Sequence, residues 1–483
     1  MVTKDGGTGR RYTRVTIDAL PDNALLETFY FYLGEDDADK IKHDHNYDGW
    51  HTLVHVCHRW RCIVFASPRR LDLKLYCTRQ RPLNSKILEI WPALPIVVVA
   101  ENLKSKEDVS NIIAALRQHS RVCKIHYYQE QFQDSLLEEF AAIDEPFSTL
   151  TSLKLFPFGQ NVPVLSDSFL GGSAPFLRSL ILGGVPYPSI GKLLSSTTNL
   201  VRLSLWRIPH SGYISPETIV PHLSTLSKLE TLFLGFQHPR SLAHRASRHH
   251  PPLARVVLSN LTSLGFRGDI EYLEDIVSQV ETPILNQSHF WFFNQIAFNA
   301  SLFGHFIHRT ETFMTIHTAC VEFLSGAVVI TLSGRGGMEN NDREALRLEI
   351  TCKPLDWQLS AVAQVLNSLL SSLPTLESLE IAVSRKDWQD EIEIIQWREF
   401  LHPFTSVTKI ILIGEYSVQL VGPTLQELAG GRTTTVLPAL QTLFLRAYRW
   451  LLPEPVKKSI EQFVAIRQLY GRPVTTHYQD TKK

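Results

Sequence analysis

LTSLKL at residues 150–155 returns in nearly the same form as LRSLIL at 177–182, LVRLSL at 200–205 and LETLFL at 229–234. Related copies follow as LTSLGF at 261–266, LESLEI at 376–381, VTKIIL at 407–412 and LQTLFL at 440–445. Within each group the copies recur every ~23 to 33 residues, a period that indicates stacked structural repeats. Leucines at a spacing of two share one face of a strand. Stretches with helical apolar spacing, such as 270–280 and 359–373, lie between copies. The sequence therefore predicts an α/β solenoid whose units are each a parallel strand and a helix.

The rest of the chain divides around this repeat region. We expect two or three degenerate repeats in 281–353, where the spacing fits poorly. The predicted organisation is a flexible tail at 1–14, a helical domain at 15–70 with an acidic loop at 34–49, first irregular repeats at 71–145, the solenoid proper at 146–452, and a C-terminal cap and tail at 453–483. A terminal cap is expected because an open repeat stack exposes an apolar end.

Composition describes an ordinary globular protein. The 48 Lys and Arg residues balance 48 Asp and Glu residues, and 44% of the chain is hydrophobic. This balance argues against a nucleic-acid or membrane partner. The start of the chain lacks the apolar region of a secretory signal, no stretch is long enough to span a bilayer, and the six cysteines show no CxxC spacing. We expect a cytoplasmic or nuclear protein with free thiols.

Two apolar-periodic segments precede the repeats. Residues 17–33 carry one amphipathic helix, and apolar residues recur at helical spacing from Trp50 to Val64 in a second. So much apolar surface on so small a piece favours a partner.

These residues resemble an F-box. The matching features are Leu20-Pro21, Leu25, Leu26 and Phe29, followed by Leu53, Val56, Cys57, Trp60 and Ile63. The resemblance implies a helical hairpin that docks on the Skp-type adaptor subunit of a cullin-RING ubiquitin ligase. It also implies that Leu20, Pro21, Leu25, Leu26 and Trp60 lie in or directly support the adaptor-binding helices. Alternatively, the same helices cap the first strand of the solenoid and bury these leucines internally.

The repeat region resembles leucine-rich repeats that have lost their regular Asn or Cys position. F-box segments followed by degenerate leucine-rich repeats are a combination found in fungal proteins. The resemblance implies a substrate-recruiting adaptor of an SCF-type ligase, with the repeat face binding a protein substrate. The alternative is a leucine-rich-repeat scaffold with no link to ubiquitination. Neither resemblance identifies the substrate or decides whether its recognition needs a phosphate or a co-ligand.

The predicted parallel sheet forms the concave face of the solenoid, and the side chains between the inward leucines must line that face. Aromatic and basic residues recur there, a composition typical of protein interfaces. Stacking of Trp206 on Phe233 merely to cover the sheet is the alternative. The predicted substrate-binding residues are Lys154, Phe156, Arg202, Trp206, Phe233, Arg267, Phe444 and Arg446.

No motif for catalysis, a metal or a cofactor stands out. His43, His45, His51, His55 and His58 lack the spacing of a zinc site. GRGG at 334–337 is not a phosphate loop, and GGSAP at 171–175 is not a nucleophile elbow. We therefore predict a protein that is not an enzyme and needs no metal or cofactor. The basic stretch 238–252 reads as a solvated loop, although it could also bind an acidic or phosphorylated partner.

Overall fold

The computed structural model divides the chain into two compact units, residues 1–126 and 127–483. It describes residues 17–33, 49–80, 82–83, 93–129, 134–157, 159, 162–239, 255–295, 298–334, 344–352, 355–369, 373, 375–384, 394–430, 436–448 and 451–478. The predicted tail at 1–14, nearly all of the predicted acidic loop and most of the basic stretch at 238–252 lie outside the described residues.

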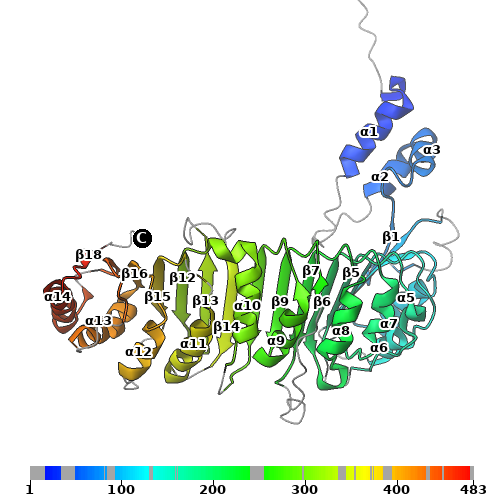
Figure 1. The fold of residues 1–483 in the computed structure, drawn as a ribbon. Helices are drawn as coiled ribbons and strands as arrows, with labels where there is room; N and C mark the ends of the chain where they lie inside the picture. Colours follow the sequence, from blue (N-terminus) through cyan, green and yellow to red (C-terminus); the bar gives the residue numbers. More distant parts are fainter. Residues whose placement is uncertain are drawn as a thin grey trace, which may run out of the picture. The chain divides into compact units, whose positions relative to one another are not determined.

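Short helices open the first unit (Figure 1). They are η1 (Ile17–Ala19), α1 (Asp22–Leu33), α2 (Gly49–Val56) and α3 (His58–Ala66). Their shared core contains the buried side chains of Leu25, Phe29, Leu53, Val54 and Val64. The apolar periodicity that predicts these helices therefore marks their packed faces.

The second predicted helix is broken at Cys57. This residue is extended, with φ −157° and ψ 170°, and its Sγ accepts a hydrogen bond from the Trp60 backbone N–H at 3.5 Å. Cys57 thus caps α3, because it satisfies one of the N–H groups that the first turn leaves without a partner. The prediction of a continuous helix through this residue is wrong.

Three strands and a helix follow in the region predicted to hold the first irregular repeats, and the last strand runs across the boundary between the units. They are β1 (Leu75–Cys77), β2 (Ile96–Glu101), α5 (Lys106–Leu116) and β3 (Val122–Gln129). β1 pairs parallel with β2. A capping box starts α5: Ser105 Oγ accepts from the Asp108 N–H, and the Asp108 carboxylate accepts from the Ser105 N–H.

The second unit is a sheet with helices. Its strands, in spatial order, are β4 (Ser152–Pro157), β5 (Ser179–Gly183), β6 (Arg202–Ile208), β7 (Thr231–Phe236), β9 (Ser263–Gly268), β11 (Gln287–Phe292), β14 (Glu344–Thr351), β13 (Ala327–Ser333), β12 (Thr318–Phe323), β15 (Ser378–Val383), β16 (Lys409–Ile413), β17 (Thr442–Arg446) and β18 (Thr475–Tyr478). A separate parallel pair consists of β8 (Val256–Val257) and β10 (Val280–Glu281).

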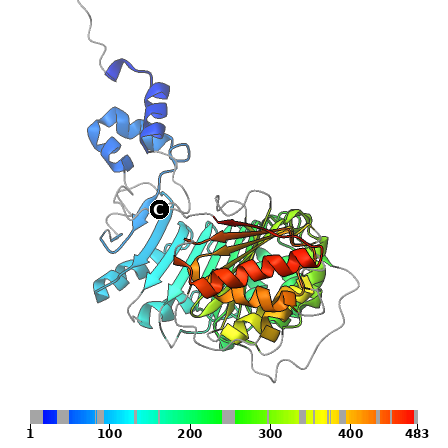
Figure 2. The ribbon, with the colours of Figure 1, turned by 90° about the vertical axis from the view of Figure 1, so that its left-hand side faces the viewer.

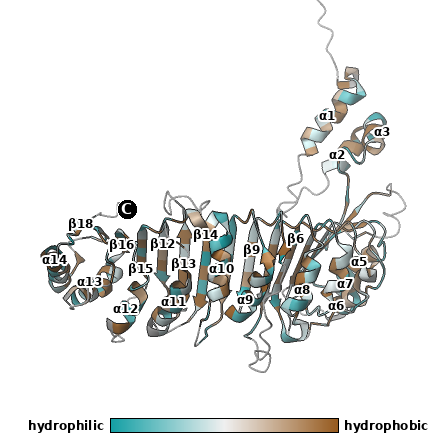
Figure 3. Ribbon diagram, viewed as in Figure 1, coloured by the Kyte–Doolittle hydropathy of each residue, from teal (hydrophilic) through white to brown (hydrophobic). Residues whose placement is uncertain are grey.

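The helices of this unit lie on one side of the sheet (Figures 1 and 2). The α-helices are α6 (Asp134–Ala141), α7 (Ile190–Ser196), α8 (Pro216–Leu223), α9 (Ile270–Gln279), α10 (Ser301–Arg309), α11 (Leu355–Leu369), α12 (Ile394–Leu401), α13 (Glu415–Gly430) and α14 (Glu454–Leu469). The short 3-10 helices are η2 (Phe169–Gly172), η3 (His210–Gly212) and η5 (Glu311–Thr315). Figure 3 shows hydrophobic residues along the strands and mixed bands on the helices.

The repeated leucines stand in register. Leu153, Leu180, Leu203, Leu232 and Leu264 are successive pairing partners across neighbouring parallel strands, and all are buried. The late group behaves alike, since Leu379 pairs with Ile410 and Ile410 with Leu443. The predicted α/β architecture with a large, mostly parallel sheet is therefore confirmed.

Residues 281–353 depart from this pattern. β13 runs antiparallel to both of its neighbours, β12 and β14, whereas β14 is parallel to β11 and β12 to β15. The Leu324 N–H donates to the Ala327 carbonyl and closes the turn between β12 and β13. A connection this short can only join antiparallel strands. The expectation of parallel repeats throughout is therefore wrong here.

The helix α14 lies in the range predicted for the C-terminal cap. After α14, Gly471 has φ +72°, the left-handed conformation that ends helices and that glycine adopts readily. β18 then joins the sheet parallel to β17, an edge strand that the sequence does not predict. Among the described residues, no helix is both long and apolar enough to cross a membrane.

Candidate functional site

The open face of the second unit is the side of the sheet that the outward strand positions line, opposite the buried leucines. In β4, β5, β6, β7, β9 and β11, these positions fall between residues that are almost completely buried. Outward side chains on these strands include Lys154, Phe156, Ile181, Arg202, Ser204, Trp206, Thr231, Phe233, Arg267, His289 and Trp291.

Aromatic rings gather on this face. The rings of Trp206 and Phe233 stack with centroids 3.6 Å apart and an interplanar angle of 18°. Phe233 also meets the Trp291 ring edge-on at 5.8 Å, and Trp291 contacts His289 at 5.6 Å. Phe233 is only 6% exposed, whereas Trp206 is 39% exposed. Phe233 was predicted to contact a partner, but it instead supports Trp206, which is the exposed member of the pair.

Glycines make room for these rings on the sheet. A Cβ atom on Gly265 would overlap Cδ2 of Phe233, and one on Gly235 would lie 2.7 Å from Cε1 of the same ring. A Cβ on Gly183 would likewise overlap the ring of Phe156. The rings therefore lie over bare backbone, which fixes their positions.

A β-bulge places Arg207 beside Trp206. The register of β6 with β7 shifts between Leu205 and Ile208, so that Trp206 and Arg207 together face a single residue, Gly235. Arg207 has φ +51°, a conformation that costs a non-glycine residue roughly 1–2 kcal/mol. Both bulge side chains are exposed, between the buried Leu205 and Ile208.

At the outward positions of the strands from β4 to β11, charge has one sign, whereas the next strand, β14, places Glu349 opposite Trp291. Lys154, Arg202 and Arg267 stand at outward positions, Arg207 lies in the bulge, and no Asp or Glu stands at an outward position of β4, β5, β6, β7, β9 or β11. The Arg267 guanidinium also lies 5.7 Å from the centre of the Phe293 ring. The surface combines cations with aromatic rings, a composition typical of protein interfaces.

The predicted substrate-binding residues on β17, Phe444 and Arg446, contact other side chains of the same sheet. Phe444 stacks on His477 at 4.8 Å and carries the Lys409 ammonium 4.5 Å from its ring centre. Arg446 Nη1 lies 3.9 Å from Oε2 of Glu380, which is 5% exposed. Burial raises the pKa of Glu380, and the charges of Arg446 and Lys409 oppose that shift. Phe444 and Arg446 are therefore part of a mixed-charge cluster.

Cys320 lies beside this cluster and pairs across the sheet with Glu380. Burial, followed by the charge of Glu380, raises the pKa of the Cys320 thiol to about 12. The thiol is protonated at neutral pH, so it lacks the thiolate character of a nucleophile.

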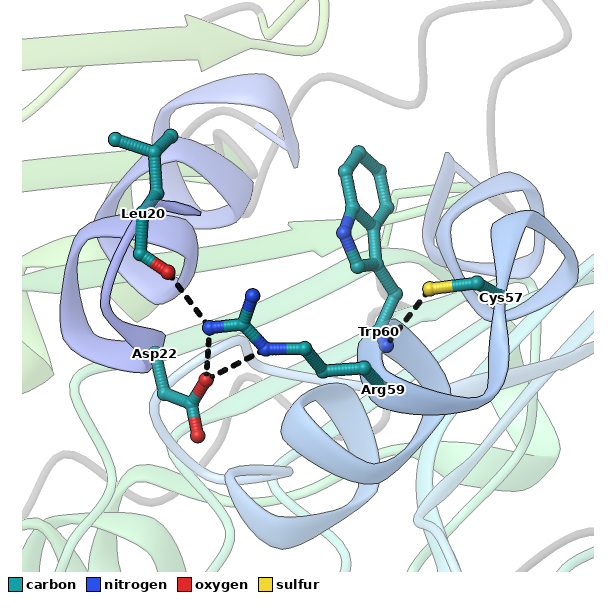
Figure 4. A network of polar contacts seen from close by, with 5 residues as sticks. All are labelled: Leu20, Asp22, Cys57, Arg59 and Trp60. Carbon is teal, nitrogen blue, oxygen red and sulfur yellow. Dashed lines mark hydrogen bonds and ion pairs between the residues drawn. The ribbon is translucent and has the colours of Figure 1, made fainter. Parts of the chain in front are cut away.

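The N-terminal helices form a second candidate surface (Figure 4). Arg59 ties α3 to the start of α1: Nη2 donates to the Leu20 carbonyl at 2.6 Å and to Asp22 Oδ1 at 2.6 Å, and Nε donates to Asp22 Oδ1 at 3.0 Å. The Trp60 ring is half-buried, 4.7 Å from that of Phe29. These contacts hold α1 against α3 and leave the Leu20-Pro21 turn at the surface.

The predicted adaptor-binding residues divide into two groups. Leu20 and Pro21 are exposed, whereas Leu25 and Leu26 are buried at 0% and 6% exposure. Leu25 and Leu26 therefore hold the helices together and offer no surface of their own to a partner. Trp60 stands between the groups, as part of the α1–α3 contact.

Sequence reasoning missed other exposed apolar side chains on these helices. Phe31 is 78% exposed, and Ile17 and Tyr32 are exposed as well. The signal was present in FYFYL at 29–33, because five consecutive apolar or aromatic residues exceed what one helix face can bury. Trp291 was missed for another reason: Ser288 stands at an inward position of its strand, where the repeat pattern expects leucine.

Metal-ligating residues do not converge in the described part of the chain, where no three His, Cys, Asp or Glu side chains are placed to hold an ion. His51 and His55 lie on α2, whereas the break at Cys57 puts His58 on α3. Burial, and then the charge of His55, lowers the pKa of His51. His43 and His45 lie outside the described residues.

Comparison with known proteins adds distant structural likeness. No family model matches the chain, and no curated protein matches it. Among solved structures, the chain is similar to the leucine-rich repeat-containing protein LegL7 from Legionella pneumophila, with 14% sequence identity and a TM-score of 0.29. The likeness covers 72% of this chain and 98% of that one. The fold description therefore rests on the strand register and buried leucines of this chain.

Proposed function

We propose that this chain is a protein-binding adaptor with two separate docking surfaces. The open face of the sheet holds a protein substrate, and the N-terminal helices dock on the Skp-type subunit of a cullin-RING ubiquitin ligase. One observation carries the proposal: the N-terminal helices bury a core of their own and still expose Ile17, Leu20, Phe31 and Val56. Several exposed apolar side chains on so small a group of helices are typical of a protein contact.

The choice of a Skp-type partner rests on the resemblance of Leu20-Pro21 and the later Cys57 and Trp60 to an F-box. The contacts of α1 and α3 support it. Arg59 fixes the Leu20-Pro21 turn, and Leu20 itself is exposed. A contact residue held in place before binding loses little conformational entropy when the partner arrives.

In this role the chain performs no chemistry. Ubiquitin transfer belongs to the partner ligase, and the chain contributes two recognition surfaces without a metal, a cofactor or a catalytic residue. The place of action would be the cytoplasm or the nucleus, where such ligases work.

The test is direct binding of the purified chain to a Skp-type adaptor subunit. Leu20→Asp and Phe31→Asp should each weaken binding at least about tenfold, because a charge would be buried at an apolar contact. Leu469→Asp is the matched control, since Leu469 is an exposed leucine of α14 in the second unit. Absence of wild-type binding, or equal binding by all three variants, would remove the ligase from the proposal.

The second candidate is a scaffold that binds proteins through the open face alone. The burial of Leu25 and Leu26 within the helices favours it, because two of the five predicted contact residues already have a structural role. Normal substrate binding by a chain that ignores Skp-type subunits would select this alternative.

A further inference from the structure

The half of the open face formed by β6, β7, β9 and β11 has features that the general proposal of protein binding does not use. Trp206 is half exposed there, and Arg207 beside it has a strained backbone conformation. The charged side chains at outward positions of these strands, Arg202 and Arg267, are both positive. We infer that this half binds an acidic, extended segment of the substrate, in which an apolar side chain packs on Trp206 and Asp or Glu side chains pair with Arg207 and Arg267. The inference rests on the proposed role of the open face in substrate binding.

Trp206 is a preformed anchor. Phe233 supports its ring at 3.6 Å, and the Trp206 carbonyl accepts a hydrogen bond from the Gly184 N–H at 2.7 Å. Phe233 is held in turn by Trp291 and by the bare backbone at Gly265. A rigid, exposed aromatic ring loses little freedom on binding and is typical of interface hot spots.

The strand register sets the spacing of the segment. Gly235 of β7 faces the bulge of β6 and pairs with Arg267 of β9, which pairs with Trp291 of β11. Trp206 and Arg267 are thus two strands apart, ~10 Å at the usual interstrand distance. An extended chain covers that distance in about three residues. We expect the apolar residue on Trp206 and the acidic residue that pairs with Arg267 to stand about three positions apart in the segment.

The backbone conformation of Arg207 indicates that its side chain has a role in binding. Its φ of +51° is a conformation that glycine adopts freely and other residues adopt at a cost. The fold alone would favour glycine in this bulge. An exposed arginine held there beside Trp206 places a guanidinium where a carboxylate could accept two hydrogen bonds.

An acidic polypeptide fits these charges better than a nucleic acid does. Nucleic-acid binding draws much of its affinity from the neutralisation of many phosphates. This chain has no surplus of positive charge, with 48 Lys and Arg against 48 Asp and Glu. A few arginines around aromatic rings match a short run of carboxylates, and the absence of Asp and Glu from the outward positions of these strands removes repulsion.

The test uses a random peptide library displayed on phage and selected on the full-length chain. We expect enriched peptides to carry Asp or Glu about three positions from an aromatic or aliphatic residue. Synthetic copies should lose about tenfold in affinity, or ~1.4 kcal/mol, for Arg207→Glu, Arg267→Glu and Trp206→Ala. Arg398→Glu is the matched control, because Arg398 is an exposed arginine on α12.

Arg207→Gly separates binding from folding. This variant relieves the backbone conformation and removes the guanidinium, so we expect an unchanged or higher thermal midpoint together with weaker peptide binding. Equal peptide affinity of Arg207→Gly and wild type would overturn the assigned role of Arg207.

Other outcomes distinguish this inference from the proposed function. Enriched peptides without acidic residues, or peptides that depend on Phe444 and Arg446 instead, would overturn the inference and leave protein binding by the open face intact. If no peptide is enriched, or if no substitution on the open face changes peptide affinity, the result would count against both the inference and protein binding by the open face. Binding of a single-stranded oligonucleotide that is lost in Arg207→Glu and Arg267→Glu would replace the acidic segment with a nucleic acid.

Discussion

Single glycines decide whether the aromatic cluster of the open face can form. Gly265→Ala would place a Cβ atom against Phe233, whose ring is fixed by Trp206 and Trp291. We expect a loss of about 1–3 kcal/mol in the free energy of unfolding, the usual cost of overpacking. Urea denaturation measures it.

Gly326→Ala is the control for this substitution. Gly326 lies in the turn between β12 and β13, and its Cβ would meet nothing within 4 Å. We expect no loss of stability there. Equal effects of the two substitutions would show that the cluster is loosely packed.

The buried carboxyl group of Glu380 should make the free energy of unfolding depend on pH. Burial raises the pKa of its carboxyl, so the folded chain holds the proton more tightly than the unfolded chain. Its contribution to stability is therefore present at low pH and is lost as the pH rises through the raised pKa. Glu380→Gln should raise the free energy of unfolding at pH 7 by about 1 kcal/mol. The gain should shrink as the pH approaches the ordinary carboxyl value, about 4.3.

Thermal unfolding at several pH values measures the effect, with Glu399→Gln as the control because Glu399 is exposed on α12. A variant that is less stable than wild type at every pH would mean that the attraction between Glu380 and Arg446 outweighs the cost of burial.

At the residue scale, the sequence predicts well on which face of the sheet a side chain stands, but it predicts poorly how deeply that side chain is buried. The period of two correctly places Trp206, Phe233 and Arg267 on the outward face, because alternation is a local property of a strand. Which of two outward rings covers the other depends on neighbouring strands. The burial of Phe233 needs glycines at 235 and 265, which lie on different strands. The strain at Arg207 depends on the register between β6 and β7 in the same way.

The break between α2 and α3 is a property of elements. Cys57 provides the acceptor that caps α3, through its Sγ and the Trp60 N–H. Cys57→Ala should lower the free energy of unfolding of the N-terminal helices by about 0.5–1 kcal/mol, as expected for a lost N-cap. Cys57→Ser should keep or raise it, because serine is a preferred N-cap residue. Helical circular dichroism during thermal unfolding reports both; two variants that behave identically would remove the capping role.

At the element scale, periodicity predicts the existence of helices and strands and fails at their connections. The apolar spacing from Trp50 to Val64 continues across Cys57 without interruption, so only the extended backbone of that residue reveals two helices. The sheet shows the same limit. β12 ends at Phe323 and β13 begins at Ala327, and the antiparallel direction of β13 follows from the tight turn between them. Apolar spacing alone does not contain that information.

At the scale of the whole molecule, the N-terminal helices and the repeat strands bury separate sets of apolar side chains. Leu25, Phe29 and Val54 are covered within the first unit, and the repeated leucines are covered by neighbouring strands and helices of the second. In a repeat stack, stability is transmitted mainly between nearest neighbours. The in-register leucines could be predicted because they repeat, whereas β18 could not, since its pairing depends on where the chain returns after α14.

This separation of cores predicts that damage to one unit stays local. Leu25→Ala should cost about 2–5 kcal/mol in the N-terminal helices, the usual range for a fully buried leucine. In hydrogen–deuterium exchange, we expect faster exchange of the backbone amides of α1, α2 and α3 and unchanged exchange in β5, β6 and β7. Leu205→Ala should do the reverse, because Leu205 is buried between Leu182 and Leu234. Faster exchange in both units after either substitution would mean that the chain unfolds as one cooperative body, and the two proposed docking surfaces could then not act independently.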